Sequence, residues 1–165
     1  MNKFYQIDYD SPIGVIEIIA TNEAVYSILF SDREEPENHV QEDTPMVLKD
    51  CFNQIDDYFK GICQEFTFPF IFDGTDFQKT VWNALTTINY ADTCSYKDIG
   101  KVIGNEKASR AIGSANGKNK LSIVIPCHRV IGSNGTLTGY AGGVWRKEWL
   151  LCHEKSMQGS QLHSR

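Results

Sequence analysis

The first thirty residues alternate between apolar and polar side chains in short pieces, which is the pattern of strands with one buried face. Turn residues interrupt the alternation at Asp10-Ser11-Pro12 and at Thr21-Asn22-Glu23. The middle piece, between these turns, is the most apolar and centres on residues 15–19. The segment from Phe4 to Phe30 therefore predicts two or three antiparallel strands.

Helical spacing replaces the alternation further along the chain. Apolar side chains recur every three or four positions from Pro45 to Phe59, with Thr44 as the expected N-cap and Gly61 as the stop. Residues 31–43 are acidic and lack aromatic side chains, which indicates a surface connection. The segment Phe66–Phe72 contains a proline, so it is expected to be an edge strand or an extended linker.

The second half predicts mostly helices. Thr75-Asp76-Phe77-Gln78 fits a capping box that opens an amphipathic helix. A short helix is expected over Ser95–Gly104, and a second, capped by Asn105, over Lys107–Asn116. Two short helices joined by a tight turn form a helix-turn-helix pattern. The second helix is rich in small residues, which would let its backbone approach a ligand closely.

A hairpin and a last helix complete the predicted elements. Ser133-Asn134-Gly135, between residues 129–131 and 136–138, is a typical hairpin turn. The last helix is expected from about Trp145 to Glu154. The sequence thus predicts an α/β chain of the α+β kind, with a sheet-and-helix domain over 1–74, a mostly helical domain over 75–155 and a disordered tail over 156–165.

Charge is strongly segregated along the 165 residues. The net charge is -5, but residues 1–96 carry -12 and residues 97–147 carry +7. A local basic surface attracts phosphates even on an acidic protein, although a solvated charged face explains the pattern equally well. Charge alone therefore leaves a nucleic-acid partner open.

Cysteine usage and hydropathy indicate the compartment. The five cysteines have no short C-x-x-C spacing, which argues against a disulfide framework and against a zinc knuckle. The N-terminus does not resemble a signal peptide, and no apolar run approaches the roughly 18 residues of a membrane span. We expect a protein of a reducing compartment, cytoplasmic or, in a eukaryote, nuclear, with no membrane partner.

The candidate chemistry lies in Ile125-Pro126-Cys127-His128-Arg129-Val130, where a thiol precedes an imidazole and a guanidinium. A thiolate is a strong nucleophile, but the free thiol is mostly protonated and needs a base or a positive charge nearby. Free cysteines are more often small buried hydrophobes. Neighbouring residues in a strand point to opposite faces, so His128 can reach Cys127 only if the backbone turns, which Pro126 makes plausible.

Three motifs together resemble a known family. They are IPCHRVIG around Cys127, the upstream SRAIGSANGKN and the downstream TGYAGGVWRKEWLLCHE. These motifs closely resemble the O6-alkylguanine-DNA alkyltransferases over about residues 75–154. The first domain resembles that family's ribonuclease-H-like domain only in its order of strands and helix. The resemblance implies direct, stoichiometric transfer of an alkyl group from O6-alkylguanine in DNA, and perhaps from O4-alkylthymine, to Cys127.

The resemblance also implies roles for individual residues. His128 would take the thiol proton through a water, Glu154 would orient His128, Tyr96 would donate to the leaving guanine and Asn119 would hold the active-site turn. The substrate pocket would include Tyr140, Ala141 and Val130. The residues expected at DNA, in the minor groove, are Tyr96, Ala108, Ser109, Arg110, Ser114 and Arg129. The resemblance also matches Arg129 to a residue that braces the active site. No cofactor and no metal are implied, and a monomer is expected.

Two other functions remain open at this point. A cysteine hydrolase also needs a thiol, an imidazole and a carboxylate, but no glycine cluster of the oxyanion-hole kind precedes Cys127. A protein that binds alkylated DNA without chemistry would need no thiol, and here Cys127 is intact.

Overall fold

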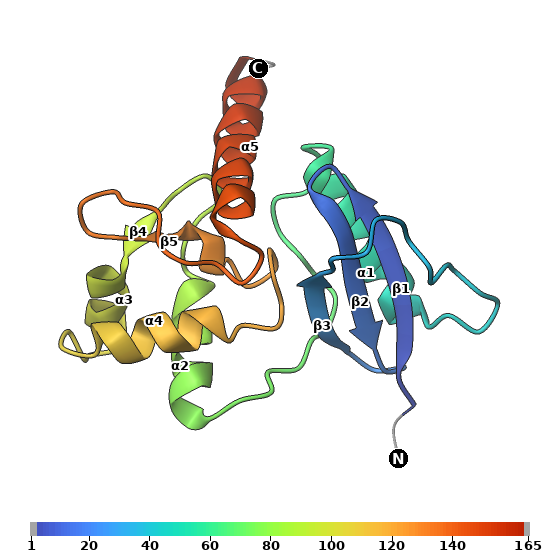
Figure 1. Ribbon diagram of the computed structural model, residues 1–165, viewed down its shortest axis with the longest axis horizontal. Helices are drawn as coiled ribbons and strands as arrows, with labels where there is room; N and C mark the ends of the chain where they lie inside the picture. The colour runs from blue at the N-terminus through green and yellow to red at the C-terminus, as the bar shows by residue number, and fades with distance from the viewer. Residues whose placement is uncertain (1–2, 164–165) are drawn as a thin grey trace. The chain divides into compact units, whose positions relative to one another are not determined.

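The structure, a computed structural model, describes residues 3–163 and divides the chain into two units (Figure 1). The first unit comprises the chain up to Asp73 together with Lys120–Val124. The second comprises Gly74–Asn119 and the chain from Ile125 onward. The sequence analysis assigned residues 120–124 to the second domain, so the return of this segment to the first unit is a correction.

The first unit contains a meander of three antiparallel strands, in the order β1 (Tyr5–Ser11), β2 (Gly14–Ala20) and β3 (Val25–Phe30). This confirms the strands predicted from the alternating pattern. Ile7, Ile16, Ile18 and Ile28 are fully buried or nearly so. The apolar side chains of the alternation are therefore the core of this unit.

Helix α1 (Met46–Phe59) packs on this sheet (Figure 1). Its buried side chains recur at helical spacing, and burying each one contributes about 1.5–3 kcal/mol; they are Leu48, Cys51, Ile55, Tyr58 and Phe59. The predicted cap is wrong by one residue. Pro45 is the N-cap, and the Thr44 hydroxyl instead accepts a hydrogen bond from the backbone N–H of Gln41.

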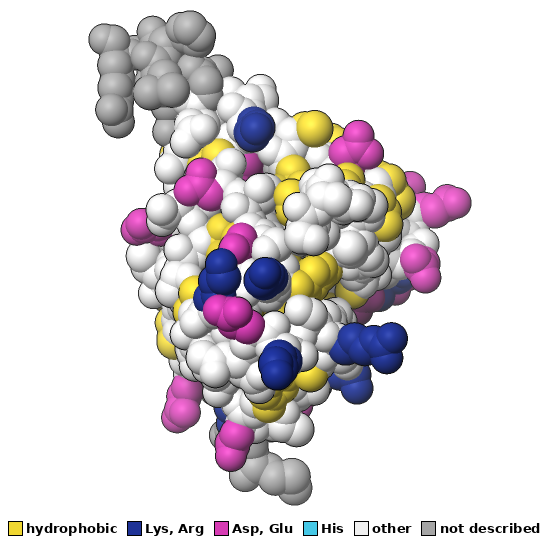
Figure 2. Space-filling model, turned by 90° about the vertical axis from the view of Figure 1, so that its left-hand side faces the viewer, with side chains coloured by type: hydrophobic (Ala, Val, Ile, Leu, Met, Phe, Trp, Pro, Cys, Tyr) yellow, Lys and Arg dark blue, Asp and Glu magenta, His cyan; other side chains and the backbone are white. Residues whose placement is uncertain are grey.

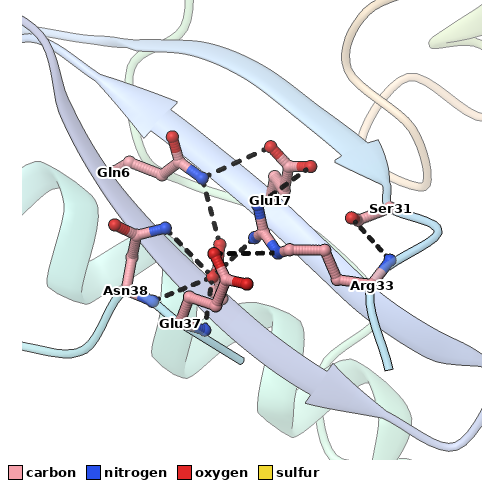
Figure 3. Close-up of polar contacts among 7 residues, drawn as sticks. Gln6, Glu17, Ser31, Arg33, Glu37 and Asn38 are labelled. Carbon is pink, nitrogen blue, oxygen red and sulfur yellow. Dashed lines mark hydrogen bonds and ion pairs between the residues drawn. The ribbon is translucent and has the colours of Figure 1, made fainter. Parts of the chain in front are cut away.

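A buried carboxylate ties the acidic connection to β1 (Figure 3). Asp8 accepts hydrogen bonds from Arg33 Nη2 at 2.6 Å and from the backbone N–H groups of Glu37 and Asn38 at 2.9 Å each. Burial alone would raise the pKa of Asp8, but the backbone N–H groups of Glu37 and Asn38 hold it below its ordinary value. The connection is therefore fastened to the sheet rather than merely solvated.

Two segments pair with the outer edge of β3. Val25 exchanges backbone hydrogen bonds with Pro69 and Ile71, so residues 66–72 are the extended linker that the sequence predicts. Ile28 does the same with Lys120 and Ser122. The chain then turns at Ile123, whose φ of 72° lies in the left-handed region that β-branched residues rarely adopt. This turn directly precedes the segment that carries Cys127.

The second unit is mostly helical, as predicted. Its elements are α2 (Asp76–Leu85), β4 (Cys94–Ser95), α3 (Tyr96–Val102), α4 (Ser109–Gly117), β5 (Val130–Ile131) and α5 (Val144–His163). The indole of Trp82, on α2, donates to the carbonyl of Ala115, on α4, at 2.8 Å. This buried hydrogen bond fixes α4 against α2.

Of the two capped helix starts predicted for this unit, the structure confirms one. Thr75 and Gln78 form the predicted capping box. The start predicted for α4 is wrong, because Ala108 is its N-cap and Asn105 caps nothing. The backbone N–H of Asn105 instead bonds to the carbonyl of Gly100, which makes residues 103–108 a turn.

The predicted hairpin is also wrong. Gly132 and Thr136 do close a turn around residues 133–135. However, Val130–Ile131 pairs in parallel with Cys94–Ser95, and residues 136–138 form no strand. The partner of this short strand lies more than thirty residues away, so a local turn signal could not identify it.

Helix α5 is longer than expected. It continues to His163, past residue 156, where the sequence analysis placed the start of a disordered tail. Residues 164–165 lie outside the described part of the chain. Within residues 3–163, none of the helices has both the length and the apolar composition that crossing a bilayer requires.

Candidate active site

Cys127 begins a single turn of 3-10 helix, Cys127–Arg129, directly after Pro126. The turn provides the change of backbone direction that contact between neighbouring side chains requires. Cys127 is 4% exposed, and its backbone N–H bonds to the carbonyl of Ile125 at 2.7 Å. The thiol therefore lies in packed structure.

Two side-chain amides hold the thiol and its backbone. The Asn119 amide donates to Cys127 Sγ at 3.2 Å and to the carbonyl of Ile125 at 2.9 Å. The Asn116 amide, on α4, donates to the carbonyl of Cys127 at 3.3 Å. Asn119 thus has the turn-holding geometry that the resemblance implies. Asn116 was not among the predicted residues.

A fully buried carboxylate joins the two residues that follow Cys127. Glu154 Oε2, on α5, lies 2.6 Å from His128 Nε2, and both side chains are 0% exposed. Arg129 donates to the same carboxylate, from Nε at 2.8 Å and from Nη2 at 3.1 Å. The backbone N–H of Ala91 adds a fourth donor at 3.2 Å. An ionised carboxylate accepts all four bonds, which is what a buried negative charge requires.

The pKa values of these groups define the resting state of the site. Burial raises the pKa of Cys127, and the Asn119 amide and the charge of Lys147 oppose it only in part. Burial lowers the pKa of His128, and the negative charge of Glu154, which would raise it, offsets this only in part. Burial would raise the pKa of Glu154, but His128 and Arg129 hold it well below its ordinary value. The resting site therefore contains a thiol, a neutral imidazole and an ionised carboxylate.

The imidazole has a defined tautomer. Glu154 is ionised and accepts only, so His128 Nε2 carries the proton that it donates. Nδ1 then has its lone pair available, and this nitrogen bonds to none of the residues that the structure describes. The imidazole is therefore set to accept a proton at Nδ1.

Lys147 is a second buried cation at this site, after Arg129, and the sequence analysis did not select it. Its side chain is 0% exposed, and Nζ donates to the hydroxyl of Thr138 at 3.2 Å. The same hydroxyl lies 2.5 Å from the hydroxyl of Tyr96, the first residue of α3. Tyr96 is therefore linked to Lys147 through Thr138.

The three predicted pocket residues lie near one another in sequence but differ in exposure. Tyr140 is half-buried and Ala141 is exposed. Val130 is fully buried within β5, so at most its backbone is available to a ligand. Within residues 3–163, no group of three His, Cys, Asp or Glu side chains is placed to hold a metal ion.

Helix α4 presents several of the predicted DNA-contact residues to solvent. Ser109, Arg110 and Ser114 are exposed, whereas Ala108 is half-buried. The side of the molecule on which Figure 1 draws α3 and α4 carries several Lys and Arg side chains, with Asp and Glu among them (Figure 2). This face is basic only in part.

Arg129 is a correction to the predicted DNA contacts. It is 6% exposed, pairs with Glu154 and donates from Nη1 to the carbonyl of Ile88 at 2.8 Å. Its guanidinium is fully engaged inside the unit and braces the carboxylate.

The sequence did carry a pattern that could have identified Lys147. With Leu150 and Glu154, Lys147 follows the i, i+3, i+7 spacing of one buried helix face.

Two family models match most of the chain. The ribonuclease-like domain of 6-O-methylguanine DNA methyltransferase matches residues 4–72, and the DNA binding domain of the same family matches residues 76–156. The first match covers the N-terminal domain, which resembled the family in the sequence analysis only through its order of strands and helix.

Full-length relatives and solved structures agree with these models. A methylated-DNA–protein-cysteine methyltransferase of Methanosarcina acetivorans is 42% identical over 156 residues, which is 92% of this chain and 99% of the relative. The crystal structure of Mycobacterium tuberculosis O6-methylguanine methyltransferase matches with a TM-score of 0.83 at 37% identity, over 94% of each chain. A structure of the M. tuberculosis protein in complex with DNA matches with a TM-score of 0.81 at 39% identity, over 91% of this chain and 92% of that one. The chain therefore belongs to the 6-O-methylguanine DNA methyltransferase family.

Proposed function

We propose that the protein repairs DNA by moving an alkyl group from the O6 atom of guanine to the sulfur of Cys127, once per protein molecule. The arrangement of Cys127, His128 and Glu154 carries this proposal. Cys127 is buried and is followed directly in the chain by His128, whose tautomer the buried carboxylate of Glu154 sets. The names of the relatives at about 40% identity support the same activity. O4-alkylthymine is a second candidate substrate.

Activation of the thiol follows from the tautomer of His128. One water between Cys127 Sγ and His128 Nδ1 carries the thiol proton to the imidazole. The imidazolium that forms is stabilised by Glu154, which already accepts the Nε2–H. The Asn119 amide, 3.2 Å from Sγ, favours the thiolate. The thiol is therefore ionised only as the reaction begins.

Transfer exchanges one bond for another. The thiolate attacks the alkyl carbon, the S–C bond forms, and the C–O6 bond breaks with its electron pair passing to guanine. Tyr96 gives its hydroxyl proton to the leaving ring and so neutralises the developing charge. The product is a thioether on Cys127 and unmodified guanine in the DNA. Water does not hydrolyse a thioether, so the protein acts once.

The DNA partner is a duplex bound through its minor groove. The lesion must leave the base stack, because a stacked base cannot present its alkyl carbon to a protein thiol, and flipping costs a few kcal/mol. Arg110 fills the space that the base leaves, and the small exposed residues Ser109 and Ser114 let α4 approach the backbone closely. Such a protein can act as a monomer.

The test is to mix the protein with a molar excess of duplex DNA that contains O6-methylguanine. We expect the amount of guanine restored to rise to one per protein molecule and then stop. Continued turnover would identify a hydrolase. Tight binding without any restored guanine would identify a protein that only recognises the lesion. Either of these results overturns the proposal.

Arg110→Ala should slow repair of duplex DNA by roughly tenfold to a hundredfold, because the flipped state loses the side chain that stabilises it. Reaction with free O6-methylguanine base, which needs no flipping, should stay within about twofold of the wild-type rate. Lys107→Ala, which removes an exposed positive charge next to the same helix, is the matched control. Equal losses on duplex and free base would contradict the flipping role.

A further inference from the structure

Two buried acceptor atoms beside Cys127 receive no hydrogen bond from the residues that the structure describes. They are Oδ1 of Asn116 and Nδ1 of His128. The Asn116 side chain belongs to a residue that is 4% exposed, and His128 is 0% exposed. Nearly all buried polar atoms in proteins have a partner, and a buried atom without one is destabilising. Two such acceptors at one site therefore point to a donor that the protein chain does not supply.

The orientation of both side chains is fixed by the bonds that they do make. Asn116 lies on α4 and bonds to the carbonyl of Cys127 at 3.3 Å. A carbonyl only accepts, so the amide nitrogen of Asn116 faces it and Oδ1 remains an acceptor. His128 follows Cys127 in the 3-10 turn, and Glu154 takes its Nε2–H, which leaves Nδ1 as the second acceptor.

The side-chain amide nearest to the thiol is not the missing donor. The Asn119 amide nitrogen donates to Cys127 Sγ at 3.2 Å and to the carbonyl of Ile125 at 2.9 Å, which uses both of its protons. A water molecule has two protons to donate, and buried waters typically make about three hydrogen bonds. One water can donate to Asn116 Oδ1 and to His128 Nδ1 and accept from the Cys127 thiol.

We propose that Asn116, through its carbonyl oxygen Oδ1, anchors the water that carries the Cys127 proton to His128. This role rests on the proposed alkyl transfer and adds a residue to it. Asn116 is a positioning residue, because it acts through the water and not on the alkyl group or the guanine. The first turn of the reaction then depends on a side chain of α4 as well as on the segment that carries Cys127.

The protons and charges of the step balance. The thiol proton passes to the water oxygen while one water proton passes to His128 Nδ1. The water keeps two protons, of which one now faces the thiolate and the other still bonds to Asn116. Two neutral groups become a thiolate and an imidazolium, and no proton leaves the site. The bond to Asn116 is the one that does not change, so it holds the water oxygen in place during the exchange.

The test is a double-mutant cycle between Asn116→Leu, which has a similar size but no Oδ1, and His128→Ala. The measured quantity is the rate at which iodoacetamide alkylates the peptide that contains Cys127. We expect Asn116→Leu to slow this reaction by roughly tenfold at about pH 7 in the wild-type background. In the His128→Ala background the loss should be less than about twofold, because the water then has no base to reach.

Asn83→Leu is the matched control, because Asn83 is an exposed asparagine on α2. It should stay within about twofold of its parent in both backgrounds. Asn116→Leu also removes the donor to the Cys127 carbonyl, but that structural effect does not depend on His128. An equal loss in both backgrounds would therefore overturn the proposal, and so would an unchanged rate in the wild-type background.

A pH profile of Asn116→Leu alone keeps the test valid if His128→Ala does not fold. The roughly tenfold loss should shrink as the pH rises from about 7 to about 9.5, because hydroxide then removes the thiol proton without the water. The charged groups around the thiol, Lys147 and Glu154, are the same in both proteins and cancel in the ratio. A ratio that stays constant over this range would contradict the anchoring role.

Failure of the proposed function has a different signature. Iodoacetamide alkylation needs neither DNA nor a methyl group, so it reports on the water and His128 alone. A wild-type protein that shows the expected cycle but leaves Cys127 unmethylated by O6-methylguanine duplex would refute the alkyl transfer and not the anchor. Methyl transfer with a cycle that shows no coupling would refute the anchor and not the alkyl transfer.

Discussion

Cys127→Ala should lose methyl transfer completely and still bind duplex DNA that contains O6-methylguanine. The sulfur is the only atom that the substitution removes, and the residues on α4 that are proposed to contact DNA are unchanged. Three of the other cysteines, Cys51, Cys63 and Cys94, are poor substitutes as nucleophiles. Burial raises the pKa of Cys51 and Cys63, and it raises the pKa of Cys94 to about 11.

Cys152→Ala is the matched control, because it removes an exposed thiol from α5, the helix that carries Glu154. This variant should transfer methyl groups at the wild-type rate. Binding is measured by titrating labelled lesion duplex, and transfer by the guanine restored. Transfer that survives in Cys127→Ala would assign the nucleophile to another residue.

Glu154→Gln should destabilise the protein by about 3–5 kcal/mol, the usual effect of breaking a buried ion pair by removing one partner. The carboxylate accepts four hydrogen bonds, and an amide leaves the Arg129 charge uncompensated. Transfer should also fall by roughly a hundredfold, because His128 loses the group that sets its tautomer and stabilises its protonated form. Urea unfolding and single-turnover kinetics measure the two effects.

The stability difference has a defined pH dependence. The folded protein holds the pKa of Glu154 below its value in the unfolded chain, so the ionised carboxylate stabilises the fold above that unfolded pKa of about 4. The difference between wild type and Glu154→Gln should be full at neutral pH and shrink as the pH falls below about 4. Glu148→Gln, at an exposed position on α5, should leave stability within about 0.5 kcal/mol of the wild type. A difference that does not vary with pH would contradict this role.

Features of the fold that depend on neighbouring residues were predictable. Alternation over residues 4–30 predicted two or three strands, of which the structure has three, and Thr75 with Gln78 predicted a helix start that the structure confirms. Asn105 is not a cap because residues 103–108 form a turn and α4 begins only at Ser109, with Ala108 as its N-cap. The return of residues 120–124 to the edge of β3 depends on a partner almost a hundred residues away, and no local pattern encodes it.

The candidate site divides in the same way. The sequence pointed to Cys127 and His128 as neighbours, and the resemblance added Glu154 and Asn119, which the structure brings to the same thiol and imidazole. The resemblance matched Arg129 both to a DNA contact and to a residue that braces the site, and the structure adds that its partner inside the unit is the carboxylate of Glu154.

Residues that the sequence did not select act through distant contacts. Asn116 reaches the Cys127 carbonyl from α4, and Thr138 links the side chains of Tyr96 and Lys147, which are far apart in the sequence. The sequence could have indicated that Lys147 is buried only with the knowledge that α5 buries the face that carries Glu154. A charged residue on the buried face of a predicted helix is therefore a useful sign of a functional site.

The measurement that tests the central claim most directly is peptide mass spectrometry of the wild-type protein after reaction with excess O6-methylguanine duplex. We predict one added methyl group per protein molecule, on the peptide that contains Cys127, with the methyl lost from the DNA. A Cys127 thiol that remains unmodified and titratable while the lesion disappears from the DNA would contradict the claim.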